Sequence, residues 1–210
     1  IDKNAYERNK EAVHNENKYV FNCMNTEKIC IFTDTGKMHT IKAVDIPLGR
    51  FRDKGTPVDN LSNYDSSQER MLYVAPVGQL RSDRLLFVTK TSMCKLVEGA
   101  EFDVAKRTIA STKLADEDEL IFIGSASEME QIVLQSHGGC FLRFLTQEVS
   151  TMKKTALGVR GMKLADDDYL EHAYLLAGRQ EYTISYHDKE YALNKVRLAK
   201  RDTKGIKPRI

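Results

Sequence analysis

Four short clusters of lysine and arginine recur along the chain, and clustered cations in loops are residue types suited to contacting phosphate groups. Taken alone, such a cluster is most often a solvated surface loop. The spacing favours function, because Arg52 and Lys106 are 54 positions apart and the next intervals, to Lys153 and to Lys200, are both 47. The candidate phosphate-contacting residues are Arg50, Arg52, Lys54, Lys106, Arg107, Lys153, Lys154, Arg160, Lys200 and Arg201.

No other constellation in the sequence predicts a catalytic site. The run 136–139 (Ser-His-Gly-Gly) is similar to the oxyanion loop of some esterases, but no G-x-S-x-G nucleophile elbow accompanies it. A hairpin turn is therefore the favoured interpretation, and a hydrolase that uses His137 is the disfavoured alternative. Walker-type phosphate loops and H-E-x-x-H zinc motifs are also missing from the sequence. We expect no metal site, no cofactor and no enzymatic activity of the chain's own.

The composition predicts a folded protein without a large excess of charge. Hydrophobic residues make up 41% of the 210 residues, and 32 Lys and Arg against 30 Asp and Glu leave a net charge of +2. A basic surface must therefore arise from clustering. The four cysteines lie far apart without a C-x-x-C pair, which indicates reduced, mostly buried thiols in the cytosol. No stretch approaches the roughly 18 apolar residues of a membrane span.

The elements that must hold the basic clusters are short β-hairpins. Four segments rich in β-branched and aromatic residues predict strands at 29–33, 85–89, 132–134 and 182–186. A polar turn follows each of them, and then a second alternating run such as 38–42. The basic cluster comes after the hairpin in every unit.

Two further strands follow the basic cluster in the middle units. They are predicted at 112–114 with 119–123, and at 162–164 with 169–176, and similar acidic turns at 116–119 and 166–168 separate them. Four strands in a unit of about 50 residues favour propeller-like blades over a helical solenoid. The sequence thus predicts an all-β ring of about four repeated four-stranded blades, with the first and last units open to being incomplete.

The remaining segments set the domain limits. Residues 1–17 are polar and charged, and a helix, a linker and the tail of a preceding, truncated blade are all open, the blade tail being favoured. The region 18–210 is predicted to be the blade domain. A polar insertion at 62–70 accounts for the longer first interval.

Several motifs resemble one family. The run 152–164, with Gly158-Val-Arg-Gly161 ahead of the acidic turn 166–168, looks like a blade of the C-terminal domain of the A subunit of bacterial DNA gyrase or topoisomerase IV. The run 85–90, with Cys94-Lys95, Glu101-Phe102 and 113–120, is similar to a neighbouring blade. The stretch 29–57 fits a third, so the resemblance covers about Lys18 to the end.

The resemblance implies a β-pinwheel, a propeller variant that exchanges strands between adjacent blades. It further implies sequence-independent wrapping of duplex DNA around a basic rim, which presents a DNA segment to the catalytic core of a type IIA topoisomerase. The implied partners are double-stranded DNA, the core of the same A subunit and, through it, the ATPase B subunit, in the bacterial cytoplasm and nucleoid. The gyrase heptapeptide Gln-Arg-Arg-Gly-Gly-Lys-Gly is absent, and 50–55 is a degenerate relative of it, so gyrase and topoisomerase IV both stay open.

Alternatives remain for individual residues and for the function. Arg160 and Lys163 have a second interpretation as salt-bridge partners of the acidic turn 166–168, which for Lys163 is equally favoured. Tyrosines such as Tyr73, Tyr182 and Tyr186 alternate within strands, which predicts packing rather than catalysis. The competing function is a propeller that serves as a protein-interaction scaffold.

Overall fold

Pairs of antiparallel strands joined by short turns form the fold, as the alternating runs predict. The structure, a computed structural model, describes residues 1–209, and four hairpins lie within them. Each predicted first strand is confirmed to within two residues at its ends. Units 1 to 4 are named for the hairpins β1 (Lys28–Thr33) with β2 (Lys37–Lys42), β4 (Arg84–Thr89) with β5 (Met93–Glu98), β8 (Gln131–Ser136) with β9 (Phe141–Leu145), and β12 (Thr183–Tyr186) with β13 (Lys189–Ala192).

Units exchange strands with their predecessors. β6 (Thr108–Ala110) follows unit 2 in the sequence but pairs with β2 of unit 1, and β10 (Val159–Arg160) follows unit 3 but pairs with β5 of unit 2. In each of units 1 to 3, a further strand pairs with the first strand of the hairpin and forms the other edge of the sheet. These strands are β3 (Met71–Pro76) beside β1, β7 (Leu120–Ser125) beside β4, and β11 (Leu170–Leu176) beside β8. The predicted all-β, propeller-like fold is confirmed. Units 1 and 2 have four strands, unit 3 has three and unit 4 has two among the described residues.

The exchanged strands lie ahead of the positions that the sequence predicts. Residues 113–114 are outside any strand, and the chain has already paired with the preceding unit at β6 and β10. Thr112 and Met162 are buried, and the next backbone amides bond across to the following loop, from Lys113 to the Lys154 carbonyl and from Lys163 to that of Thr203. The predicted strands at 112–114 and 162–164 are wrong, because the free edge of the neighbouring hairpin sets these short strands and side-chain alternation does not.

The hydrophobic core lies between successive units. Phe87 belongs with Phe32 to the cluster between units 1 and 2, where their ring centroids are 6.3 Å apart. Leu86, the next residue towards the N-terminus, points to the other face and packs in the cluster that holds Leu134 of unit 3. A third cluster around Phe141 joins units 3 and 4. Because both faces of a central hairpin are buried, its strands read as nearly continuous apolar runs.

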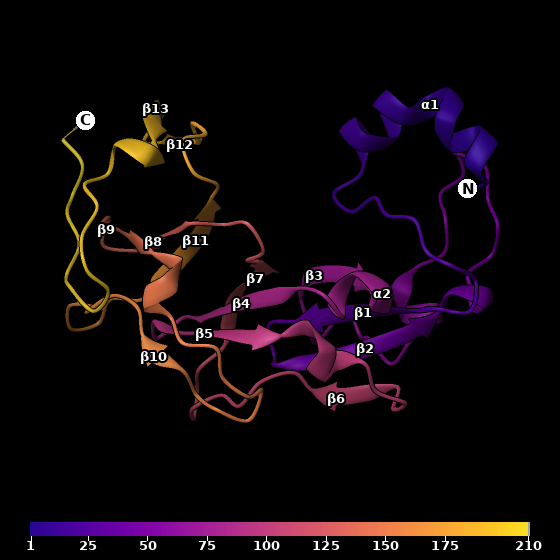
Figure 1. The fold of residues 1–210 in the computed structure, drawn as a ribbon, viewed down its shortest axis with the longest axis horizontal. Coiled ribbons are helices and arrows are strands. Elements are labelled where there is room, and N and C mark those ends of the chain that lie inside the picture. The colour runs from indigo at the N-terminus through magenta and orange to yellow at the C-terminus, as the bar shows by residue number, and fades with distance from the viewer. Residues whose placement is uncertain (210) are drawn as a thin grey trace.

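The units follow one another along an arc (Figure 1), with α1 (Lys3–Glu16) near one end and β12–β13 near the other. A short second helix, α2 (Val77–Leu80), follows β3. The side chain of Asp2 caps α1 by accepting a hydrogen bond from the Ala5 amide at 2.7 Å, and Val13 is its one buried residue. Of the three interpretations of 1–17, the structure shows the helix. The domain boundary at residue 17 stays a prediction. Within residues 1–209, no helix has the length and apolar character to span a membrane.

Carboxylates of the repeated acidic turns accept hydrogen bonds from the turns of the hairpins. The carboxylate of Asp118 accepts hydrogen bonds from the amide and hydroxyl of Thr91, in the turn between β4 and β5. Asp168 accepts the amide of Gly138 at 2.8 Å, in the turn between β8 and β9. Burial of Asp168 would raise its pKa, but the hydrogen bonds from Gly138 and Ser136 outweigh burial and lower it. The last aspartate of each turn therefore ties two segments of its unit together.

Candidate nucleic-acid interface

The four basic clusters occupy equivalent places in the four units. Each hairpin runs into one turn of 3₁₀-helix, and the cluster begins four or five residues after that turn ends. β6 and β10, which follow the second and third clusters, lie on the outer side of the arc (Figure 1). We call the clusters basic loops 1 (50–55), 2 (106–107), 3 (153–157) and 4 (200–204). The 3₁₀ turns are Ala43–Asp45, Gly99–Phe102, Thr146–Glu148 and Leu193–Lys195.

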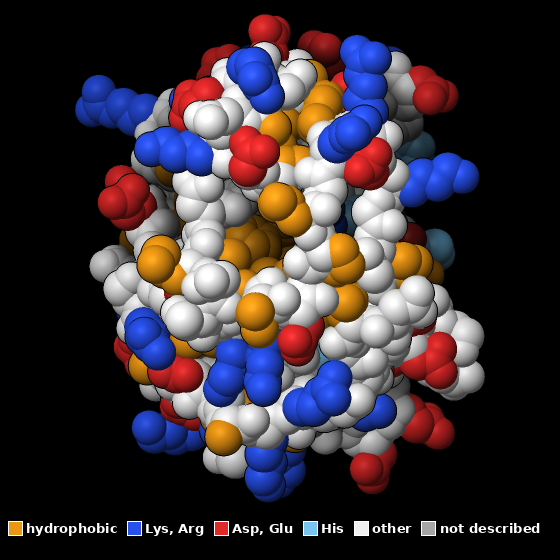
Figure 2. Space-filling view, turned by 90° about the vertical axis from the view of Figure 1, so that its right-hand side faces the viewer, with side chains coloured by type: hydrophobic (Ala, Val, Ile, Leu, Met, Phe, Trp, Pro, Cys, Tyr) orange, Lys and Arg blue, Asp and Glu red, His pale blue; other side chains and the backbone are white. Residues whose placement is uncertain are grey.

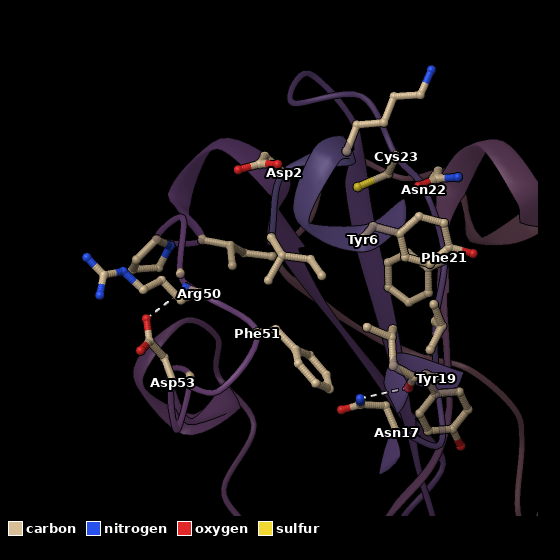
Figure 3. Close-up of a pocket in the computed structure, with 18 of the residues that line it drawn as sticks. Asp2, Tyr6, Asn17, Tyr19, Phe21, Asn22, Cys23, Arg50, Phe51 and Asp53 are labelled. Atoms are coloured by element: carbon tan, nitrogen blue, oxygen red, sulfur yellow. Dashed lines mark hydrogen bonds between the residues drawn. The ribbon is translucent and has the colours of Figure 1, made fainter. Parts of the chain in front are cut away.

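Basic loop 1 presents three cations to solvent. Arg50, Arg52 and Lys54 are exposed, and none of them forms an ion pair with another described residue. The Arg50 amide donates to the carboxylate of Asp53 at 2.7 Å, which closes the turn. Phe51 points into a hollow of about 780 Å³ beside α1, while the Arg50 guanidinium points away from it (Figure 3). This side of the molecule shows hydrophobic side chains around a central hollow, with Lys and Arg distributed around them (Figure 2).

Basic loop 2 is held along the edge of unit 1. Lys106 and Arg107 are exposed, and the Arg107 carbonyl accepts the Thr40 amide at 2.9 Å. The Arg107 guanidinium makes one long contact, 3.5 Å, to the carbonyl of Leu61 in the segment before the polar insertion. The insertion is itself fixed by Glu69, a buried carboxylate that accepts His39 Nε2 at 2.7 Å. Loop 2 thus offers two cations on a fixed backbone.

Basic loop 3 is partly neutralised by a carboxylate of the preceding unit. Glu101 lies 3.4 Å from Lys153 Nζ and 3.9 Å from Lys154 Nζ, and it also accepts the Lys154 amide at 3.1 Å. The Lys153 side chain is 82% exposed, whereas that of Lys154 is only 31% exposed. An ion pair as exposed as that of Lys153 is worth about 0–1 kcal/mol, so this lysine can turn to another anion.

Basic loop 4 contains two exposed lysines, Lys200 and Lys204, and one arginine that binds the protein itself. Lys200 is exposed, but Arg201 is half-buried, and its guanidinium donates to the carbonyls of Glu148 and Arg160 at 3.0 and 2.6 Å. Arg160 forms two hydrogen bonds to Asp202, which hold the pKa of this carboxyl below its usual range. The structure therefore engages Arg201 and Arg160 in the fold. Their DNA contacts stay predictions.

The alternative interpretations of the sequence have different outcomes. Arg160 pairs with Asp202 and not with the acidic turn 166–168, and Lys163 forms no ion pair within the described part of the chain. The run 136–139 is confirmed as a hairpin turn, in which His137 stacks on Tyr169 and bonds to Glu171.

The predicted packing role of the tyrosines holds for Tyr73 and Tyr186, which pack edge-on or tilted against Phe32 and Phe141. Tyr182 contacts Tyr174 in the same way but is 43% exposed.

Three residues of the site are not identified by the sequence reasoning. Lys95 is buried and bonds to loop 3, and Glu101 and Glu148 occupy matching places in successive 3₁₀ turns. The sequence does contain a signal for Lys95, because this lysine interrupts an apolar strand. Lysine is almost never fully buried unless it has partners.

The four cysteines differ in their exposure. Cys30 and Cys94 are buried and Cys140 is half-buried, as predicted, whereas Cys23 is exposed; all four are free thiols. Within residues 1–209 no group of three or more His, Cys, Asp or Glu side chains is placed to hold a metal ion.

Comparison with known proteins identifies relatives over most of the chain. A family model described as "DNA gyrase C-terminal domain, beta-propeller" matches residues 27–66, 83–127 and 130–177, together more than half of the chain. The A subunit of DNA gyrase from Ureaplasma parvum is 27% identical over 184 residues, which are 85% of this chain and 22% of the relative. The A subunit of DNA topoisomerase 4 from Bacillus subtilis is 28% identical over 159 residues, 74% of this chain and 20% of the relative. The chain spans about a fifth of the length of these curated relatives.

Two solved structures share the fold. The C-terminal domain of DNA topoisomerase IV superposes with a TM-score of 0.79 at 22% identity, over 98% of this chain and 67% of the other. The C-terminal domain of DNA gyrase A gives a TM-score of 0.64 at 21% identity, over 88% of this chain and 60% of the other.

Proposed function

Because this chain belongs to the DNA gyrase C-terminal domain family, we propose that it binds duplex DNA through its basic loops, without reading sequence, and bends the DNA along the outer side of the arc. The observation that carries the proposal is the repetition of exposed cations at one place in four successive units. A protein that bends DNA without reading its bases needs positive charge at intervals along a convex path, because phosphate contacts position the duplex but specify no sequence.

The exposure and pairing of the ten candidate cations favour some of them over others for this role. Of the ten candidates, Arg160 is paired with Asp202, Arg201 bonds to carbonyls and Lys154 is half-buried beside Glu101. Seven exposed candidates remain, namely Arg50, Arg52, Lys54, Lys106, Arg107, Lys153 and Lys200. At about 0.9 per phosphate contact, seven contacts give a slope of log K against log salt concentration of about −6.3.

Several loops must act together to bend DNA. Bending 20–30 bp by 40–90° costs on the order of 1–6 kcal/mol, which the phosphate contacts made by the bent duplex must offset. Loops 2 and 3 are fixed by bonds to the preceding unit, so they lose little conformational freedom when DNA binds.

The proposal extends to the longer relatives. In an A subunit, the bent segment would be presented to the catalytic core and, through it, to the ATPase B subunit, in the bacterial cytoplasm and nucleoid. The chain itself would act as an accessory domain, without a cofactor or a reaction of its own.

The test is a salt titration of binding to a duplex of about 150 bp, with donor and acceptor dyes at the DNA ends. Between 50 and 200 mM salt, a slope of about −6.3 predicts that affinity falls by about 10³ to 10⁴, and bending predicts a shorter end-to-end distance on binding. Failure to bind at 50 mM would refute the proposal and favour the scaffold function. Binding without shortening would refute bending alone.

A further inference from the structure

Lys95 is a fully buried lysine whose ammonium group is used by a loop of the next unit. It lies in β5 with 1% of its surface exposed, and Nζ donates to the carbonyls of Lys154 and Ala156 at 2.8 and 2.6 Å. The same Nζ is 5.7 Å from the ring centroid of Phe87. A charge removed from water is costly unless it is paired or hydrogen-bonded, so the two carbonyls are a condition for keeping this lysine buried.

A carboxylate of the same unit holds the loop from its other side. Glu101 lies in the 3₁₀ turn after β5, its side chain is 15% exposed, and it accepts the Lys154 amide. Unit 2 therefore forms hydrogen bonds to basic loop 3 at the amide of residue 154 and at the carbonyls of residues 154 and 156. The Lys153 side chain, adjacent to these contacts, stays in solvent.

The carboxylate contact recurs one unit later. Glu148 holds the matching place in the next 3₁₀ turn and accepts the Arg201 amide at 2.9 Å, and each carboxylate reaches 53 residues along the chain. In loop 4 the Arg201 guanidinium supplies the bonds to carbonyls, whereas in loop 3 a lysine from the preceding hairpin does so. Holding a basic loop from the preceding unit is thus a repeated feature of this fold.

We propose that Lys95 is a positioning residue for DNA binding, which fixes basic loop 3 so that Lys153 faces the duplex. This inference rests on the proposed function. Lys95 cannot contact a phosphate itself, because its side chain is buried under the loop. Its effect runs through the loop backbone, since a loop ordered before binding loses less conformational freedom when it meets DNA.

The test is a double-mutant cycle of Lys95→Met with Lys153→Gln, read out as the salt slope on the 150 bp duplex. Methionine keeps an unbranched side chain, one atom shorter than that of lysine, and removes the hydrogen-bond donors. Each single variant should make the slope shallower by about 0.9, the value of one phosphate contact, and the double variant should lose no more than either single variant. Hydrogen exchange at the Lys154 amide should be faster in K95M. If K95M does not fold, Lys95→Gln, which keeps a donor for one carbonyl, replaces it in the cycle.

Val97→Ala is the matched control, because Val97 is a buried residue of the same strand that packs in the cluster facing unit 1. It should lower stability and leave the salt slope unchanged. The inference is overturned if K95M keeps the wild-type slope, if the two losses add, or if V97A loses as much slope as K95M. Absence of wild-type binding would instead overturn the proposed function, and this inference with it.

Discussion

Neutralising basic loop 1 should remove more of the salt dependence of DNA binding than neutralising any other loop. The perturbation is the triple variant Arg50→Gln, Arg52→Gln and Lys54→Gln. All three side chains are exposed and free of ion pairs with the described residues, and the turn is closed through the Arg50 amide, which the substitutions keep. The loop should therefore keep its conformation and lose only its charge.

The expected magnitude follows from the number of free cations in each loop. Three contacts at about 0.9 each would change the slope from about −6.3 to about −3.6. Over the range from 50 to 200 mM, the loss of affinity would shrink from between 10³ and 10⁴ to about 10². Neutralising Lys106 and Arg107 should change the slope by about 1.8, and neutralising Lys200 by about 0.9.

The assay is fluorescence anisotropy of the 150 bp duplex at five or more salt concentrations, with the thermal unfolding of each variant recorded beside it. The control removes three exposed cations from α1, by Lys3→Gln, Arg8→Gln and Lys10→Gln, and so has the same net charge as the loop variant. The reasoning is refuted if both triple variants change the slope equally, since net charge and not loop position would then set binding. It also fails if Lys200→Gln has as large an effect as the loop 1 variant.

Three further predictions concern stability and the engaged cations. Asp202→Asn should free Arg160 for phosphate and steepen the salt slope by about 0.9, measured in the same titration; an unchanged slope would show that Arg160 does not reach DNA. Phe87→Ala should lower the free energy of unfolding by about 3–5 kcal/mol in urea, whereas Leu48→Ala, at a 77% exposed position, should change it by less than about 0.5 kcal/mol; similar values for both would contradict the inter-unit core. Burial lowers the pKa of Lys95 to about 8 in the folded chain, against 10.5 in the unfolded chain, so the unfolded chain binds more protons between these two pH values. The stability of the wild type relative to K95M should therefore rise with pH across that range. A stability difference that stays constant from pH 7 to 10 would refute this prediction.

The sequence predicts the repeating hairpins correctly because their signal is local. Alternating apolar side chains, a polar turn and a second alternating run occur within about 15 residues, and no distant contact is needed to recognise them. The place of the basic loops follows equally directly, since each comes a few residues after its hairpin. The predicted strand at 119–123 corresponds to β7, and that at 169–176 to β11, for the same reason.

The local periodicity of the sequence does not predict strand exchange. β10 has two residues, and it is a strand only because β5 of another unit offers it a free edge, so the prediction falls a few residues too late. A period-two pattern cannot be recognised over two or three residues.

The tertiary structure likewise decides how many cations of the basic loops stay unpaired. From the sequence, Arg160, Arg201 and Lys153 are equivalent candidates, but the groups that bond to them lie 41 to 53 residues away along the chain. Coulomb interactions and hydrogen bonds act over a few ångströms, so folding must first bring Asp202, Glu148 and Glu101 to these loops. The sequence by itself determined the repeating unit and the position of its cations, because both depend on neighbours along the chain. Only the tertiary structure decided which strand completes which sheet and which cations stay free, because both depend on what a neighbouring unit places beside them.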